Sequence, residues 1–281
     1  MESVFYIIII TRVPIEITIK NMPTNLADIL NIVLMISVAA VSGLVGSFAL
    51  MKRMALASDA ISHIALPGLG LAILLNINPL WGGLVALVLG AIIIWAIESQ
   101  TKISTETVIG VVFSASLAIG SLITPSHELE EVLFGDIATP SVMEGLVGLI
   151  VTLVIGFTLL MIREKIVLSM VSQDLARTIG LKTSRINFIF LLLFSINVLL
   201  GLKFLGVLLM GALVIVPAAV AKNLATGLNA DLWLSSFMAV LSVVVGFLVA
   251  SATQLTLGPV IISVATIFFI ISILIKLVLR R

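Results

Sequence analysis

The stretch ASDAISHIALPGLG, residues 57–70, places a carboxylate and an imidazole four positions apart in an otherwise apolar sequence. In a helix, Asp59 and His63 lie on one face one turn apart, and Pro67 follows on that face after another turn. Proline has no amide hydrogen to donate to the carbonyl oxygen of His63, so we expect the helix to bend there. A carboxylate, an imidazole and a freed carbonyl oxygen on one stripe predict half of a site for a divalent cation.

Two simpler interpretations account for the same residues. Asp59 can cap the start of a helix beside Ser58, and His63 can be an interior histidine bonded to a neighbouring backbone group. The spacing alone leaves these interpretations open. Inside a membrane, however, an ionisable residue is a functional candidate by default.

The composition indicates an integral membrane protein. Of 281 residues 61% are apolar and only 10% are charged, whereas soluble domains carry about 25% charged residues. A membrane-spanning helix needs about 20 apolar residues, and the continuous runs favour helices over a β-barrel. We therefore predict an all-α integral membrane protein, a polytopic bundle of 8–9 transmembrane helices. The candidate runs are residues 29–51, 60–75, 79–97, 107–123, 145–162, 186–202, 204–221, 232–252 and 255–275.

The remaining segments are short. Residues 1–28 are predicted to be an extracytoplasmic or interfacial extension, because their apolar part is too short to span, and residues 29–281 to be a single transmembrane domain. The loops leave no room for a soluble domain, and no P-loop, HExxH or GxSxG motif occurs. Any ATP hydrolysis that drives transport must therefore take place on another chain. Cysteine is absent, so a metal site has to use His, Asp, Glu or neutral oxygen ligands.

The basic residues predict the orientation. If the loop that holds Lys52 and Arg53 is cytoplasmic, 12 of the 15 Lys and Arg residues fall on the cytoplasmic side. Only Arg12, Lys20 and Lys203 fall outside. Positive charge marks cytoplasmic loops, so we predict an N-out, C-in topology.

Two further segments are candidates for function. Residues 169–182, SMVSQDLARTIGLK, predict a short amphipathic helix that either joins two spans or docks a cytoplasmic partner. Its candidate coupling residues are Ser172, Gln173, Asp174, Leu175, Arg177 and Gly180, where Ser172 begins the helix and Gly180 ends it. In the run 204–221, Pro217 frees the carbonyl oxygen of Leu213 and predicts a kink, either on the transport path or as an aid to packing.

Four stretches in order resemble one protein family. They are GSFALMKRMALASDAISHIALPGLGLAILL (46–75), EEVLFGDI (130–137), QDLARTIGL (173–181) and GVLLMGALVIVPAAVAKNLA (206–225). Together they resemble the membrane permease subunit of ABC importers for zinc, manganese and ferrous iron. The resemblance extends from about residue 30 to the C-terminus, and residues 1–28 match nothing in that family.

The resemblance implies a homodimeric permease in a prokaryotic inner membrane, bound to two copies of a cytoplasmic ABC ATPase. It implies an extracytoplasmic metal-binding protein that docks near residues 126–136, and places Asp59 and His63 on the metal pathway. The chain is then a transport subunit and not an enzyme. It has no permanently bound cofactor and does not bind nucleic acid. Its substrate is Zn²⁺, Mn²⁺ or Fe²⁺, among which an Asp–His pair does not choose.

Two other classes of transporter stay open. An ATP-independent cation carrier or channel can also use an intramembrane Asp–His pair, but it has no need of a docking segment at 169–182. A permease for metal chelates, such as siderophores or cobalamin, needs a wide and largely uncharged path, in which Asp59 and His63 would be out of place.

Overall fold

The structure is a computed structural model that describes residues 26–54, 56–101, 103–123, 142–171, 176, 178–205 and 207–279. In these residues the chain forms ten main helices and no strand. They are α3 (Leu26–Met51), α4 (Ala57–Ile64), α5 (Leu66–Leu74), α6 (Pro79–Gln100), α7 (Thr105–Ile123), α9 (Val142–Val171), α11 (Thr183–Leu205), α12 (Val207–Leu224), α13 (Leu228–Thr253) and α14 (Leu257–Leu279).

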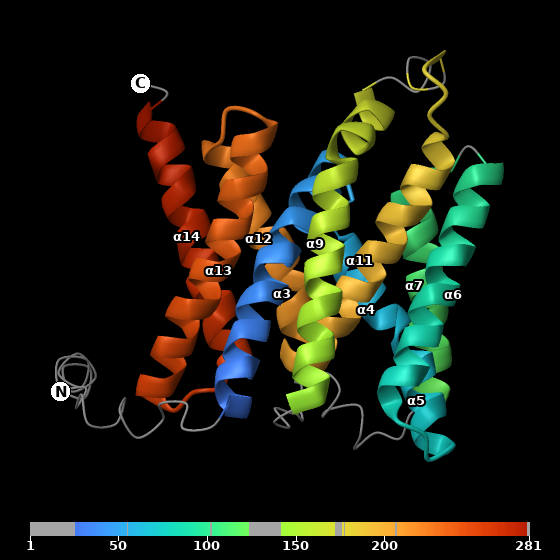
Figure 1. Cartoon of the computed structure of the whole chain (residues 1–281), viewed down its shortest axis with the longest axis horizontal. Helices are drawn as coiled ribbons and strands as arrows, with labels where there is room; N and C mark the ends of the chain where they lie inside the picture. The colour runs from blue at the N-terminus through green and yellow to red at the C-terminus, as the bar shows by residue number, and fades with distance from the viewer. Residues whose placement is uncertain are drawn as a thin grey trace, which may run out of the picture.

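The helices form one bundle with three neighbouring parts (Figure 1). Helices α12, α13 and α14 pack together at one side, and α5, α6 and α7 pack together at the other. Helices α3, α9, α11 and α4 lie between these groups, and α4 and α11 contact both of them. The short helix α4 is therefore placed where the two sides of the bundle meet.

The helix lengths confirm the predicted all-α membrane architecture. Eight stretches of the described chain are long and apolar enough to cross a membrane, with α4 and α5 counted together as Ala57–Leu74. Residues Leu209–Leu224 of α12 form a shorter apolar helix. Each of the nine predicted runs falls on these elements, and α3 begins at Leu26, slightly before the predicted start at residue 29.

Small residues bring the helices into close contact. A Cβ atom on Gly46 of α3 would lie 1.9 Å from the carbonyl oxygen of Val214 on α12, so only glycine fits. Two buried hydroxyls of α13 bond to the backbone of α3: Ser235 Oγ donates to the carbonyl of Gly43 (2.7 Å), and Ser236 Oγ to that of Ala40 (2.9 Å). Close backbones and bonds between helices hold spans together where lipid gives no hydrophobic drive.

Basic side chains gather at one end of the bundle. The end of α3 and the start of α11 lie at the upper end in Figure 1, as do the ends of α12 and α14. These ends carry Lys52, Lys182, Lys222 and Lys276. Lys203 lies near the lower end of α11, where its Nζ is 3.1 Å from Glu144 Oε1. The predicted clustering of positive charge on one side is thus present in the described chain.

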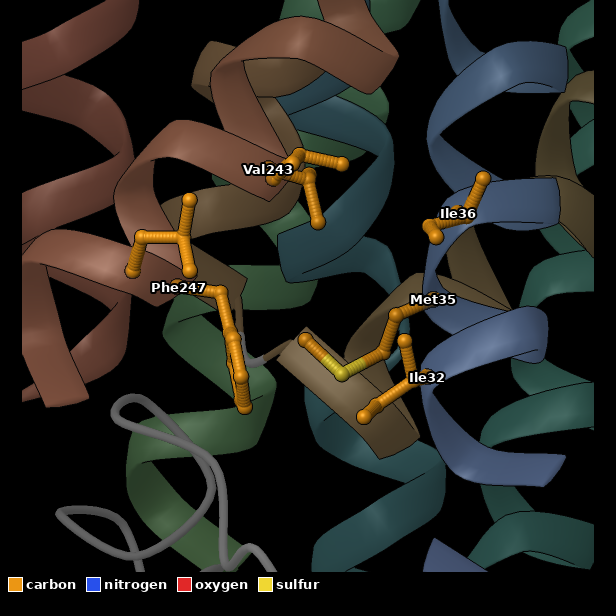
Figure 2. Close-up of a pocket in the computed structure, with 7 residues that line it drawn as sticks. Ile32, Met35, Ile36, Val243 and Phe247 are labelled. Carbon is orange, nitrogen blue, oxygen red and sulfur yellow. The ribbon is translucent and has the colours of Figure 1, made fainter. Parts of the chain in front are cut away.

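The outer surface of the bundle is apolar. Large side chains such as Trp81, Phe157 and Trp233 are more than half exposed. A groove of about 140 Å³ lies between α3 and α13 (Figure 2). It is lined by Ile32, Met35, Ile36, Val243, Val244, Phe247 and Leu248. It offers no charged ligand for a metal ion, and its chemistry is that of a surface that faces lipid chains.

Candidate functional site

Helix α4 is a mostly buried helix with one open stripe. It packs against α7 and α12, with α11 and α6 behind it. Within residues 57–70 only Asp59, His63, Pro67 and Gly68 escape full burial. The predicted shared face of Asp59, His63 and Pro67 is therefore the one face of this stretch that the chain leaves uncovered.

The two ionisable side chains of the stripe point toward each other. His63 Nε2 lies 3.8 Å from Asp59 Oδ1, and the side chains are 19% and 58% exposed, respectively. Two ligand atoms on one tetrahedral zinc ion are separated by about 3.4 Å, given metal–ligand bonds of about 2.1 Å. A small side-chain adjustment thus lets both residues bind the same ion.

The neighbouring helix α12 holds Asp59 in place. Ser58 Oγ donates a hydrogen bond to the carbonyl oxygen of Gly211 (3.1 Å), which ties the two helices together. A Cβ atom on Gly211 would lie 3.3 Å from Asp59 Oδ1, so glycine leaves room for the carboxylate. On α4 itself, Ser62 Oγ donates to the backbone oxygen of Asp59 (2.7 Å).

His63 is positioned by packing. Its ring centroid lies 5.5 Å from that of Phe113 on α7, with the planes tilted by 55°. Its Nδ1 atom is buried and has no hydrogen-bond partner among the described residues. Within the described chain, His63 is therefore not an interior histidine whose ring nitrogen bonds to a neighbouring backbone group.

The capping interpretation of Asp59 is wrong. The N-cap residue of α4 is Leu56, and no side chain caps the helix. The hydroxyl of Ser58 is used between helices, in the bond to Gly211. Asp59 lies in the first turn of α4, where its carboxylate interacts favourably with the helix dipole, but it does not cap the helix.

The predicted bend at Pro67 is present as an interruption of the helix. Helix α4 ends at Ile64, and α5 begins at Leu66 with Pro67 in its first turn. The amide of Ala65 donates to the carbonyl of Ser62 (3.3 Å), a tighter turn than an α-helix. Pro217, by contrast, is a buried residue inside the single helix α12, and its predicted role on the path stays a prediction.

The end of the predicted coupling segment is described. Gly180 has φ +77°, and the amide of Leu181 donates to the carbonyl of Ala176 (2.9 Å). This is a Schellman cap, so Gly180 ends a helix as predicted. Residues Ser172, Gln173, Asp174, Leu175 and Arg177 lie outside the described residues, as does the acidic loop 126–136.

A half-buried lysine, Lys52, lies in the turn that leads into α4. Burial lowers the pKa of Lys52 from 10.5 to about 8, and the nearby Glu98 carboxylate acts in the opposite direction. Between these two values the unfolded chain binds more protons than the folded one. Raising the pH from about 8 to 10.5 therefore stabilises the fold, and lowering it through about 8 removes that stabilisation.

We expect this titration to be visible in thermal unfolding of the purified chain. The melting temperature of the wild type should rise by a few degrees, relative to Lys52→Met, between pH 7 and pH 10. The neighbouring Arg53→Met is the control, since its guanidinium does not titrate in this range. An equal pH dependence of wild type and Lys52→Met would contradict the assignment.

Comparison with known proteins places the chain in a family. The model of the ABC 3 transport family matches residues 27–276. The chain belongs to the ABC 3 transport family. It is 28% identical to the high-affinity zinc uptake system membrane protein ZnuB of Buchnera aphidicola, over 83% of this chain and 91% of that protein. It is 29% identical to the manganese import system permease protein ScaB of Streptococcus parasanguinis, over 84% and 86% of the two chains.

A solved structure has the same fold. The structure described as PsaBC from Streptococcus pneumoniae in complex with Fab matches with a TM-score of 0.77 and 27% identity, over 90% of this chain and 93% of that one. The family resemblance expected from the four sequence motifs is thereby confirmed, and the chain is a multi-pass membrane permease of the ABC 3 type.

Two neighbours of the stripe formed by Asp59, His63 and Pro67 were not predicted from the sequence. Gly211 was visible only as one small residue of an apolar run, and Phe113 as one aromatic among 13 phenylalanines. Their roles depend on which helices meet, and nothing local in the sequence signals that α7 and α12 flank α4.

Proposed function

We propose that this chain is the transmembrane subunit of an ATP-driven importer that carries a divalent transition-metal ion, Zn²⁺ or Mn²⁺, into the cytoplasm. The observation that carries the proposal is the Asp59–His63 pair, 3.8 Å apart on the open stripe of an otherwise buried helix. Family membership and the zinc and manganese permeases among the relatives support it. Carboxylate and imidazole are ligands that both ions accept, so the pair does not decide between them.

A second copy of the chain is proposed to complete the site. No group of three or more His, Asp and Glu side chains able to hold a metal is found in the described part of the chain. Transition-metal ions take four or more ligands. A two-fold axis next to the open stripe would bring together two copies each of Asp59 and His63. It would also cover Asp59, whose 58% exposed carboxylate is otherwise costly at the surface of a membrane bundle.

The energy source is proposed to be a pair of cytoplasmic ABC ATPase subunits that dock on residues 172–180. The capped helix end at Gly180 supports this assignment, since it gives the docking segment a fixed end beside α11. ATPase closure pushes on this segment, the spans rock, and the metal site opens to the outside. Hydrolysis then reopens the cytoplasmic side.

The outer partner is proposed to be a metal-binding protein that docks near residues 126–136, with the chain in a prokaryotic inner membrane. The basic helix ends support an N-out, C-in orientation, because positive loops stay in the cytoplasm. In this orientation the loop between α7 and α9 faces outward, where its acidic side chains attract cations.

Uptake of radioactive zinc and manganese by proteoliposomes tests the proposal. The vesicles hold the chain with its ATPase subunit, and loaded binding protein is added outside. We expect uptake that requires ATP and stops with a hydrolysis-deficient ATPase. Equal uptake without the ATPase subunit would identify a carrier or channel, and uptake only of a chelate would identify a metal-chelate permease.

A further inference from the structure

A polar cavity lies at the end of the bundle that carries the basic helix ends, apart from the Asp59 site. It measures about 590 Å³ and opens between the ends of α6, α7 and α11. Its wall includes the indole of Trp95, whose Nε1 donates to Ser184 Oγ (2.8 Å) and to the Ser184 carbonyl (3.0 Å). Hydroxyls surround it, from Ser99, Thr101, Ser104, Thr105, Thr183 and Ser184.

One carboxylate lines this cavity and is only half satisfied. Glu98 Oε1 accepts a hydrogen bond from Asn187 Nδ2 (2.8 Å), whereas Oε2 is buried without a partner among the described residues. A buried carboxylate oxygen without a donor is unfavourable. The missing group is therefore a donor, and a cationic one makes the strongest bond to a carboxylate.

The Lys52 ammonium, which interacts with the Glu98 carboxylate through space, already has other partners. Lys52 Nζ donates to Asn187 Oδ1 and lies 5.3 Å from the centroid of the Phe190 ring. Asn187 thus stands between Lys52 and Glu98 and bonds to both. Glu98 lines the cavity, so a rotation of its carboxylate would turn the buried Oε2 toward a group that enters through the cavity mouth.

The cavity is continuous with the proposed ATPase contact. A second hollow of about 400 Å³ is formed by residues 180–184 and shares Thr183 and Ser184 with the cavity. Gly180 at its edge is the end of the coupling segment. A protein docked at Gly180 therefore lies beside the cavity mouth.

The cavity is also connected to helix α4. Lys52 belongs to the turn between α3 and α4, which is closed by bonds from Met54 N to the Ala49 carbonyl (2.8 Å) and from Ala57 N to the Met54 carbonyl (3.1 Å). Asp59 follows two residues after Ala57. The chain of contacts from Glu98 through Asn187 to Lys52 therefore links the cavity to the turn before the metal stripe.

We propose that the ATPase subunit inserts an arginine or lysine side chain into this cavity, where it bonds to Glu98 Oε2 and the surrounding hydroxyls. This contact rests on the proposed function and adds a second point of attachment to the coupling segment. Movement of the inserted cation is passed through Asn187 and Lys52 to α4, which couples ATPase closure to the metal site.

The first test is the affinity of the ATPase subunit for the full chain in nanodiscs. Glu98→Gln keeps the shape of the side chain and removes its charge, so we expect the Kd of the ATPase to rise about tenfold. Glu106→Gln, an exposed acid at the start of α7, is the matched control and should leave the Kd unchanged. An unchanged Kd for Glu98→Gln would overturn the proposal.

A second test identifies the occupant directly and works even if Glu98→Gln folds poorly. The chain has no cysteine, so Ser99→Cys places a single photo-crosslinker at the cavity, and Ser121→Cys places one at the far end of α7 as a control. We expect crosslinks to the ATPase from position 99 alone. The absence of a crosslink from both positions would overturn the proposal. The proposal would also be overturned if Lys102→Ala raised the Kd of the ATPase as much as Glu98→Gln does.

These results are separable from the proposed transport function. Glu98→Gln should still bind zinc at the Asp59–His63 site, measured as metal bound per chain, because the cavity and the stripe share no residue. Loss of bound zinc in Glu98→Gln with unchanged ATPase affinity would identify the cavity as a cation site and overturn the proposal. Failure of wild-type uptake with normal ATPase binding would instead reject the transport function alone.

Discussion

Replacing Asp59 by alanine is expected to lower metal uptake by the reconstituted importer at least about 100-fold. Changing a group that only hydrogen-bonds to a metal ligand already costs about 10–100-fold. Asp59 is the only carboxylate of the α4 stripe. A divalent ion in a low-dielectric path needs negative ligands to offset the loss of its hydration. His63→Ala removes the second ligand and is expected to reduce uptake in the same direction.

The variant should retain its fold and its ATPase partner. Asp59 is 58% exposed and does not cap α4, so its removal costs only the first-turn interaction with the helix dipole, about 0.3–1 kcal/mol. Size-exclusion co-elution with the ATPase subunit checks assembly, and Glu106→Ala serves as the control for loss of a carboxylate elsewhere in the membrane bundle. Uptake by Asp59→Ala within a factor of two of wild type, in an assembled complex, would remove Asp59 from the pathway.

Much of the fold could be predicted because each membrane-spanning helix corresponds to a continuous apolar run in the sequence. The requirement that every backbone group be bonded inside lipid leaves few alternatives to helices. The polar stripe was also visible, because an ionisable pair at helical spacing stands out against apolar neighbours. Pro67 marked the break between α4 and α5 for a local reason, the loss of one amide donor.

The partners of the stripe could not be predicted, because they depend on contacts distant in sequence. Gly211 and Ser58 are 153 positions apart, and their bond exists only because α12 crosses α4. The same holds for Asn187 and Glu98, which are 89 positions apart and look like ordinary polar residues at helix ends. The spacing of Asp59 and His63 predicted the chemistry of the site. The residues that surround the pair are determined by helix packing and could not be predicted.

Replacing Gly68 by leucine is expected to prevent the chain from reaching its folded state. Helices α5 and α6 cross with their backbones in contact at Gly68 and Gly82. A Cβ on Gly68 would lie 2.1 Å from the carbonyl oxygen of Gly82, and a Cβ on Gly82 would lie 2.0 Å from that of Gly68. Backbone atoms cannot move aside as a flexible side chain can, so the helices must separate. Overpacking typically costs about 1–3 kcal/mol and occasionally more, and a clash with backbone belongs to the upper end. This is a large part of the stability of a typical protein, about 5–15 kcal/mol.

The test compares Gly68→Ala with Gly68→Leu by the monodisperse fraction and the melting temperature in detergent. It asks whether close packing at Gly68, rather than any increase in side-chain size, destabilises the fold. Gly110 on α7 is the matched control, because a Cβ there would meet nothing within 4 Å. Gly110→Ala should keep or slightly raise the melting temperature, since alanine favours helices over glycine. If Gly68→Leu and Gly110→Leu lower the folded fraction equally, the α5–α6 contact is not what requires glycine. If only Gly68→Leu does so, the crossing that follows the break at Pro67 is fixed by backbone contact, and α5 provides a rigid base below the metal stripe.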